Sequence, residues 1–351
     1  MHIIAVIGCG RISDAAHFPA LSAMEDVRIK YACDLIREKA EEKKEKYPKI
    51  ENVITDYKQA LADPEVETVY VLTPNYAHYT VTMDSLAAGK NVFCEKPITV
   101  NYPLSLEMKK AADKAGKMLN IGVCNRYHRS VEKLAELNKE GKFGNIYHVY
   151  CSFRSFRSIP GLGGAFTDKS QSGGGVLIDQ AIHSIDRVRY MLDSDVEWID
   201  GSVHNYVHHF VKVEDAADAA IMFKNGCLYN LYACNIYGAD SPINIELIGE
   251  KGRLGLKQDM GYYELDGTYA EIRNTYETTN VGPDYWGSSH HLQIRDFYRS
   301  VREDLPVAID GLEGRKTLEM VKGIYLSSAR RERISLPFED VTYSDLNQPV
   351  K

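Results

Sequence analysis

Three groups of residues have the types and the spacing that chemistry requires. The densest is the segment Gly173-Gly-Gly-Val-Leu-Ile-Asp179-x-x-x-His183-x-x-Asp186. Residues three and four apart share one face of a helix, so these two carboxylates would flank the imidazole. Because histidine titrates near neutral pH, it could act there as a general acid or base. A buried helical histidine with a structural role gives the same pattern, so this segment alone leaves both interpretations open.

The other two groups each follow an apolar strand directly. Thr73-Pro74-Asn75-x-x-His78 comes after the predicted strand 68–72, and Glu95-Lys96-Pro97 comes after the predicted strand 91–94. In open parallel sheets, ligands bind outside the carboxyl ends of the strands. Both groups are therefore expected to face a ligand. The alternative for Lys96, a solvated lysine in a surface loop, is disfavoured by its place at the end of a strand.

A glycine-rich turn near the start of the chain adds a binding element. The apolar, β-branched run that begins at Ile3 leads into Gly8-Cys9-Gly10-Arg11-Ile12-Ser13. Gly8 would permit a tight turn, and Gly10 would let the backbone approach a pyrophosphate. The helix that follows would direct its amide donors at the same group. Ser13 replaces the usual third glycine or alanine, so the motif is imperfect and, taken alone, could be a simple turn.

Asp34 indicates which dinucleotide would bind. It ends the predicted strand 27–33, about 20 residues beyond the glycine turn, where an acidic residue holds the hydroxyls of the adenosine ribose. A carboxylate repels a 2′-phosphate, and no Arg or Ser follows Asp34 directly, although Arg37 and Lys39 stand nearby. NAD(H) is therefore favoured over NADP(H). The competing interpretation of Asp34 is a helix N-cap.

The elements that must position these residues alternate between strand and helix through the first third of the chain. Helices are predicted at 37–47, 79–88 and 104–115, among the strands already named and a further strand at 118–123. This rhythm is typical of a doubly wound α/β domain with a parallel sheet. We predict a Rossmann domain that binds NAD(P) over residues 1–123.

Beyond residue 124 the pattern becomes that of an α+β domain. Strands are predicted at 146–153, 216–223, 227–236 and 243–248, and the second and third are joined by an Asn225-Gly226 hairpin turn. Helices are predicted at 131–138, 176–191, 292–301 and 314–331. We predict a substrate-binding and oligomerisation domain over 124–351 with an open-faced, mostly antiparallel sheet. Helices cover one face of that sheet at most, so a homodimer or homotetramer is expected to cover the other.

Taken in order, these motifs resemble those of the oxidoreductases named after glucose–fructose oxidoreductase, inositol dehydrogenase and the rhizopine-catabolism protein (Gfo/Idh/MocA). The resemblance covers nearly the whole chain, and its most specific parts are Glu95-Lys96-Pro97 and the Gly173–His183 segment. It implies a Rossmann domain followed by an open-faced sheet, NAD(P) as cofactor, and chemistry on a secondary hydroxyl of a sugar or cyclitol. Ala181 stands where many members have glycine, a departure that bears on the substrate rather than on the chemistry.

Carried over by position, the resemblance implies a catalytic trio of Lys96, Asp179 and His183. His183 would take the alcohol proton as hydride leaves for the nicotinamide, and Lys96 would stabilise the developing alkoxide. Asp179 would pair with Lys96 or hold the imidazole, and the sequence leaves that choice open. The expected cofactor contacts are Gly8, Gly10, Arg11, Ile12, Asp34, Thr73, Pro74, Asn75, His78, Glu95 and Lys96.

Several aromatic and hydrogen-bonding side chains near the predicted cleft suit a sugar, because rings pack against C–H faces while polar groups bind hydroxyls. Each has an alternative interpretation as a solvated residue or a subunit contact. The expected substrate contacts are Arg126, Tyr127, Arg154, Tyr237, Trp286 and His290. His204, His208 and His209 have no carboxylate or cysteine at ligand spacing, so no metal is expected.

Composition narrows the class of protein further. The chain carries a formal net charge of −7, which argues against nucleic acid or an anionic membrane as a partner. No stretch reaches the length of a membrane span, and a strand that starts at residue 3 leaves no room for a secretory signal. The seven cysteines are odd in number and form no C-x-x-C pair, which fits reduced thiols in the cytoplasm.

Two other functions fit the same residues. One is a redox-neutral lyase or glycosidase that oxidises its substrate transiently and recycles bound NAD. The other is a non-catalytic sensor of nucleotide and sugar, although sensing does not need Lys96, Asp179 and His183 together. We expect an NAD-dependent dehydrogenase of a sugar, glycoside or cyclitol; the sequence names neither the sugar nor the carbon that is oxidised.

Overall fold

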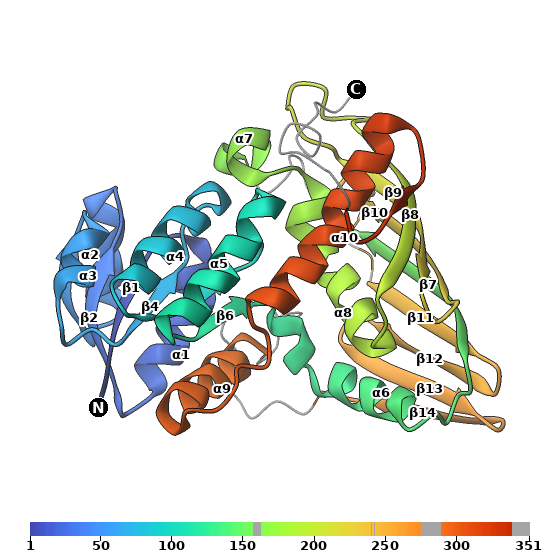
Figure 1. Cartoon of the computed structure of the whole chain (residues 1–351), viewed down its shortest axis with the longest axis horizontal. Coiled ribbons are helices and arrows are strands. Elements are labelled where there is room, and N and C mark those ends of the chain that lie inside the picture. The colour runs from blue at the N-terminus through green and yellow to red at the C-terminus, as the bar shows by residue number, and fades with distance from the viewer. Residues whose placement is uncertain (157–162, 240, 242, 275–288, 339–351) are drawn as a thin grey trace. The chain divides into compact units, whose positions relative to one another are not determined.

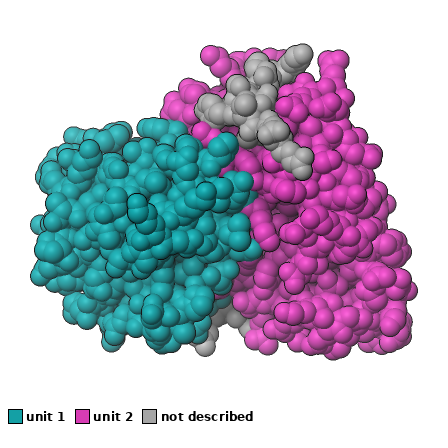
Figure 2. Space-filling model, in the orientation of Figure 1, with its two compact units in different colours: residues 1–99, 103–124, 276–315 teal, residues 100–102, 125–275, 316–351 magenta. Residues whose placement is uncertain are grey.

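The computed structural model of the chain describes residues 1–156, 163–239, 241, 243–274 and 289–338. The chain forms two compact units, which Figure 2 colours separately. The first unit comprises residues 1–99, 103–124 and 276–315, and the second comprises residues 100–102, 125–275 and 316–351. The functional division into a cofactor domain over 1–123 and a substrate domain over 124–351 stays a prediction.

A six-stranded parallel sheet forms the centre of the first unit, in the order β3-β2-β1-β4-β5-β6 (Figure 1). This order reverses direction between β1 and β4, and ligands of such sheets bind at that switch point. Every residue of β4 is buried, as expected for a strand with helices on both faces. The strands are β1 (His2–Ile7), β2 (Val27–Cys33), β3 (Ile50–Ile54), β4 (Thr68–Val71), β5 (Asn91–Glu95) and β6 (Leu119–Gly122).

Helices from both ends of the chain complete the first unit. Phe297 lies on α9, far along the sequence, yet its ring is 5.6 Å from the ring of Phe93 on β5, which stacks at 5.2 Å on Tyr70 of β4. Helix α9 is therefore part of the core of the first unit. The helices are α1 (Phe18–Ala23), α2 (Arg37–Lys46), α3 (Tyr57–Ala62), α4 (His78–Ala87), α5 (Tyr102–Ala115) and α9 (Ser289–Glu303), with short helical turns η1 (Ser13–His17) and η2 (Asn75–Ala77).

A nine-stranded sheet forms the centre of the second unit, in the order β14-β13-β12-β11-β7-β10-β9-β8-β15. Only the pair β7 and β10 is parallel; the other neighbours run antiparallel. Gly226, with a φ of +84°, lies in the turn of the β9–β10 hairpin, as predicted. The strands are β7 (Ile146–Arg154), β8 (Val196–His204), β9 (Ala216–Phe223), β10 (Leu228–Cys234), β11 (Asn244–Gly249), β12 (Gly252–Lys257), β13 (Met260–Leu265), β14 (Thr268–Ile272) and β15 (Ile334–Ser335).

Helices α6 (Arg129–Lys139), α8 (Ile182–Leu192) and α10 (Gly311–Arg330) lie on one side of this sheet (Figure 1). The second unit also contains the short helix α7 (Lys169–Ser172) and the helical turns η3 (Cys124–Tyr127), η5 (Gly164–Thr167) and η6 (Leu177–Ala181). The other face presents side chains such as Tyr150 and Tyr232, which are 54% and 42% exposed. The predicted fold class, a Rossmann unit plus an open-faced and mostly antiparallel sheet, is confirmed. Within the described residues, none of the helices combines the length and the hydropathy needed to cross a bilayer.

Candidate active site

The glycine turn after β1 leaves space on one side and none on the other. Gly8 has a φ of +104°, and a Cβ added to it would lie 2.5 Å from the carbonyl oxygen of Leu72, just after β4. Only glycine fits there, because the ends of β1 and β4 meet at the switch point of the sheet. A Cβ added to Gly10, in contrast, would meet nothing within 4 Å. That open space is the cradle a pyrophosphate requires, so the turn fits a dinucleotide.

The carboxylate of Asp34 is held at the edge of this turn. Its Oδ2 accepts from the backbone N–H of Cys9 at 2.9 Å, and its Oδ1 accepts from that of Ile36 at 2.9 Å. Helix α2 has Ile36 as its N-cap residue, so Asp34 is not the N-cap. Each carboxylate oxygen has a further lone pair for a ribose hydroxyl. Arg37 donates to Glu41 at 2.7 Å, so this nearby cation is already paired.

The other residues of the turn differ in exposure. Ser13 is buried, and its hydroxyl donates to the carbonyl oxygen of Gly10 at 2.7 Å. The serine therefore stabilises the turn by this hydrogen bond, at the position where the usual motif has a third small residue. Arg11 is exposed, and Ile12 is half-buried and packs against the core of the first unit.

His78 links the two groups of residues that follow β4 and β5. It is buried, with Nδ1 2.7 Å from the carbonyl oxygen of Pro97 and Nε2 2.9 Å from that of Thr73. Burial lowers the pKa of His78, although the two carbonyl oxygens act in the opposite direction. Pro74 is exposed and Asn75 is half-buried. His78 thus fixes the turn after β4 against the turn after β5.

Glu95 is a buried carboxylate with two partners in the first unit. Its Oε1 lies 2.8 Å from Nε2 of His17, and its Oε2 accepts from the backbone N–H of Lys96 at 3.2 Å. A Cβ on Gly122 would lie 2.9 Å from the carboxylate, so glycine there leaves room for it. Burial acts to raise the pKa of Glu95, but the hydrogen bond from His17 and the electrostatic effect of neighbouring groups, Lys96 among them, outweigh it, and the pKa lies below its usual value.

His17 is a residue of this site that the sequence did not single out. It is the last residue of η1, directly before α1, and it is fully buried. Its ring contacts Tyr70 and Phe93 edge-on, at centroid distances of 5.9 and 5.2 Å. Nothing in its spacing pointed to Glu95, which is far along the chain. The contact arises only because η1 and the end of β5 meet in the folded sheet.

The three predicted catalytic residues are each half-buried in a segment whose other residues are buried. Between Val92 and Thr99, only Lys96 is not buried. Between Ser172 and Arg189, only Asp179 and His183 are not buried. In each segment the chain therefore leaves accessible the side chains to which chemistry was assigned and covers their neighbours.

The segment that carries Asp179 and His183 begins with a wide helical turn. Residues Leu177–Ala181 form the π-helical turn η6, and α8 continues from Ile182. The backbone N–H of Asp179 donates to the carbonyl oxygen of Gly175 at 3.0 Å. Single π turns at the ends of α-helices are frequent at functional sites. The predicted helix at 176–191 is confirmed, but its wide first turn was not predicted.

Asp186, the third member of the predicted helical group, belongs to a buried ion pair. Its two oxygens accept from Nε and Nη2 of Arg126, both at 2.7 Å, and Oδ1 also accepts from Thr317 at 2.6 Å. Burial acts to raise the pKa of Asp186, but the charges of Arg126 and Arg189 outweigh it, and the pKa is lowered. Arg126, predicted as a substrate contact, thus donates two hydrogen bonds inside the second unit and is itself buried.

The remaining predicted substrate contacts are dispersed. Arg154 stacks on Tyr237, 4.7 Å from the ring centroid, and strand alternation puts it on the face of the sheet without helices. Its neighbour Ser155 donates to Gln180, next to Asp179, at 2.7 Å. Tyr127 is half-buried on η3. Trp286 lies outside the described residues.

His290 lies in the first unit, at the start of α9. Its Nε2 is 3.3 Å from the Sγ of Cys124. Burial lowers the pKa of His290 to about 4, so the ring is neutral at physiological pH. A neutral ring beside a thiol can accept a hydrogen bond from it.

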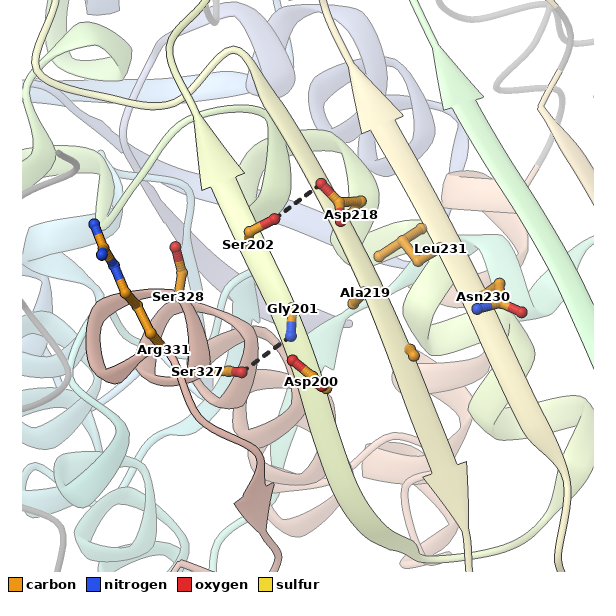
Figure 3. A pocket seen from close by; sticks show the side chains of 11 residues that line it. Asp200, Gly201, Ser202, Asp218, Ala219, Asn230, Leu231, Ser327, Ser328 and Arg331 are labelled. Atoms are coloured by element: carbon orange, nitrogen blue, oxygen red, sulfur yellow. Dashed lines mark hydrogen bonds between the residues drawn. The ribbon is translucent and has the colours of Figure 1, made fainter.

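A hollow of about 580 Å³ lies elsewhere in the second unit and contains none of the predicted site residues. Figure 3 shows it between the end of α10 and strands β8 to β10, where Ser202 donates to Asp218 at 3.0 Å. Ser327 accepts from the backbone N–H of Gly201 at 3.0 Å, which satisfies an edge-strand donor. In the described part of the chain, no three His, Cys, Asp or Glu side chains gather as metal ligands would.

Comparison with protein families supports the assignment of the motifs. A family model described as "Oxidoreductase family, NAD-binding Rossmann fold" matches residues 3–123. A second, described as "GFO/IDH/MocA C-terminal domain", matches residues 131–255.

Individual relatives match along most of their length. A D-glucoside 3-dehydrogenase of Escherichia coli is 27% identical over 95% of this chain and 97% of its own. A myo-inositol 2-dehydrogenase of Thermotoga maritima is 27% identical over 96% of this chain and 99% of its own. A levoglucosan dehydrogenase solved with NADH and levoglucosan has a similar fold, with a TM-score of 0.86 at 21% identity over 96% of this chain and 100% of that one.

Proposed function

The chain belongs to the GFO/IDH/MocA family of NAD-binding oxidoreductases, and from this we propose that it transfers a hydride between a secondary hydroxyl of a sugar, glycoside or cyclitol and NAD. The observation that carries the proposal is the partial exposure of Lys96, Asp179 and His183 within two otherwise buried segments. Relatives named as glucoside and inositol dehydrogenases support the substrate class.

The residues around the glycine turn hold the cofactor in this proposal. Gly10, Arg11 and Ile12 would hold the pyrophosphate, and Asp34 would accept from the ribose hydroxyls. When bound, NAD supplies the electrophilic nicotinamide carbon that accepts the hydride. The groups after β4 and β5 would hold the nicotinamide half: Thr73, Pro74, Asn75, His78, Glu95 and Lys96. The pairing of Arg37 with Glu41 supports NAD over NADP.

The proton chemistry belongs to three side chains. His183 accepts the proton of the reacting hydroxyl, as a general base whose ordinary pKa lies near neutrality. Lys96 donates a hydrogen bond to the same oxygen, where negative charge develops as the C–H bond breaks. Asp179 orients one of these two groups. In the reverse direction His183 returns the proton to the new alkoxide.

The predicted substrate contacts do not have equal support. Tyr127 and Arg154 are half-buried and Tyr237 is 42% exposed, whereas Arg126 is buried and already pairs with Asp186. We assign Arg126 first to the support of α8, and its role as a substrate contact stays a prediction together with those of Trp286 and His290.

We propose that the protein acts in the cytoplasm as a homodimer or homotetramer that covers the helix-free face of the large sheet. The seven cysteines, all of them free and buried, support a reducing compartment. Exposed tyrosines on that face support an interface. Light scattering at micromolar concentration tests the assembly, and a monomer would contradict it.

A substrate screen tests the reaction. Purified protein with NAD is offered glucosides, free sugars and inositols, and the absorbance of NADH is followed. Net NADH formation with at least one of them is expected. Conversion of substrate without net NADH would instead support the redox-neutral reaction, and binding without conversion would support a sensor.

A further inference from the structure

A buried polar cluster lies behind the segment that carries Asp179 and His183. Glu214, which precedes β9, is fully buried, and its Oε1 accepts three hydrogen bonds. Two come from the backbone N–H groups of Gly175 and Leu177, at 2.8 and 3.0 Å, and the third comes from the hydroxyl of Tyr325 on α10, at 2.6 Å. One carboxylate oxygen therefore joins three separate parts of the second unit at the start of η6.

The glycines of the Gly173-Gly-Gly motif make this contact possible. A Cβ on Gly174 would lie 1.9 Å from the Tyr325 hydroxyl, and a Cβ on Gly175 would lie 2.0 Å from the carbonyl oxygen of Glu214. Gly174 also has a φ of +153°, which is unfavourable for residues with a side chain. These two glycines thus allow α10 and the start of β9 to approach the backbone, a role that requires no bound ligand.

The cluster contains buried ionisable side chains, Lys322 in addition to Glu214. Lys322 on α10 is fully buried, and within the described residues its Nζ makes no hydrogen bond. That nitrogen lies 5.5 Å from the centre of the Tyr325 ring, and Nζ of Lys169 lies 5.4 Å from the same ring. Burial lowers the pKa of Lys322 to about 7, and burial raises the pKa of Glu214. Apolar side chains of similar size would often be at least as stabilising as such buried charges.

We propose that Glu214 and Tyr325 are positioning residues for Asp179 and His183. The path is short: Tyr325 bonds to Glu214, Glu214 bonds to the N–H of Gly175, and the carbonyl oxygen of Gly175 accepts from the N–H of Asp179. His183 follows one helical turn later. The inference rests on the proposed function, because it concerns the placement of the groups that act on the substrate hydroxyl.

Tyr325→Phe is the sharpest variant, because it removes one hydroxyl and keeps the ring. Misplacement of a catalytic group by about 1 Å can cost on the order of 100-fold in rate, so kcat is expected to fall about 10- to 100-fold. The dissociation constant of NAD, which binds to the first unit, should not change. Glu214→Gln keeps the acceptor oxygen and should lose less activity than Glu214→Ala.

Tyr229→Phe is the matched control. Tyr229 is a buried tyrosine of the same unit, beside the Cys151 thiol, and its hydroxyl makes no hydrogen bond of ordinary geometry to the described residues. Tyr325→Phe should unfold at a lower temperature than Tyr229→Phe, because it removes a hydrogen bond to a buried carboxylate. At a temperature where both variants are folded, only Tyr325→Phe should lose kcat. An equal loss of kcat in both would overturn the proposal.

Two readouts without substrate separate this proposal from the dehydrogenase assignment. Hydrogen exchange at the amides of Gly175 and Leu177, measured by NMR, should accelerate in Tyr325→Phe and not in Tyr229→Phe. The pKa of the His183 ring, also followed by NMR, should shift in the same variant. Unchanged exchange, or faster exchange with the His183 ring and kcat both unaltered, would refute a positioning role. Wild-type protein that oxidises no sugar or cyclitol would refute the dehydrogenase assignment instead, and the His183 ring would still report on the positioning.

Discussion

Replacement of His17 by leucine should destabilise the protein strongly and disturb Lys96. The variant leaves Glu95, which is 6% exposed, without the donor that now lies 2.8 Å from its Oε1. A buried carboxylate that loses its partner is left uncompensated, which costs about 3–5 kcal/mol. At about 2–4 °C per kcal/mol for a unit of this size, the midpoint of thermal unfolding should fall by about 6–20 °C.

The dependence of this effect on pH has a definite sign. The pKa of Glu95 is lowered in the folded protein, so its ionisation stabilises the fold above its ordinary pKa. That contribution disappears as the pH falls through the folded pKa. The difference between wild type and His17→Leu should therefore be largest at neutral pH and shrink in acid. Thermal unfolding followed by circular dichroism at several pH values measures it.

His17→Gln is the control for this prediction, because its amide can still donate to Glu95. It should recover more than half of the lost stability and most of kcat. The other oxygen of Glu95 accepts from the backbone of Lys96, so His17→Leu should also lower kcat at temperatures where it is folded. A His17→Leu protein with wild-type stability at neutral pH would refute the assignment of the pair.

Three further results are expected. The free energy of unfolding of Gly10→Ala should lie within about 0.5 kcal/mol of wild type, because its Cβ meets no protein atom, yet calorimetry should show NAD binding at least about 10-fold weaker. Gly8→Ala, with its Cβ 2.5 Å from a carbonyl oxygen, should lose both stability and NAD affinity. An unchanged NAD affinity in Gly10→Ala would exclude the turn as the pyrophosphate site. Asp34→Ala should weaken the binding of NAD and relax the discrimination against NADP. A wild-type protein that prefers NADPH would contradict this role of Asp34. Arg126→Leu and Asp186→Leu should each lower the free energy of unfolding by about 3–5 kcal/mol, because each leaves a buried charge without its partner. The double variant should lose less than the sum of the two, and additive losses would argue against the pair.

The alternation of strand and helix was sufficient to predict the parallel sheet of the first unit, but not that α9 packs in the same core. Strands such as 68–72 are short, continuous and apolar, and Gly89 and Gly116, with positive φ, end helices where the sequence indicated. The Asn225-Gly226 turn likewise fixed one hairpin of the second sheet. Patterns of this kind depend on a few neighbouring residues, so they can be recognised without knowing how the rest of the chain folds.

Elements stabilised by distant partners escaped prediction. Strand β8 contains Asp200 and Gly201, which are poor strand formers. It pairs with β9 along one edge, and along the other it is stabilised by the short strand β15 and by serines of α10. Strands β12 to β14 contain several glycines and charged residues, and their hairpins complete the sheet edge. The pairings of His17 with Glu95 and of Asp186 with Arg126 join residues far apart in sequence, so spacing could not reveal them.

The central claim is that His183 and Lys96 carry out proton and charge chemistry at a substrate hydroxyl. The most direct measurement compares kcat and NAD affinity of His183→Ala and Lys96→Ala with wild type, on whichever sugar or cyclitol the screen identifies. Loss of the base should lower kcat about 100- to 10,000-fold. Loss of the lysine donor should lower it about 100- to 1,000-fold, with NAD affinity nearly intact in both variants. A His183→Ala protein with near-normal kcat would contradict the mechanism.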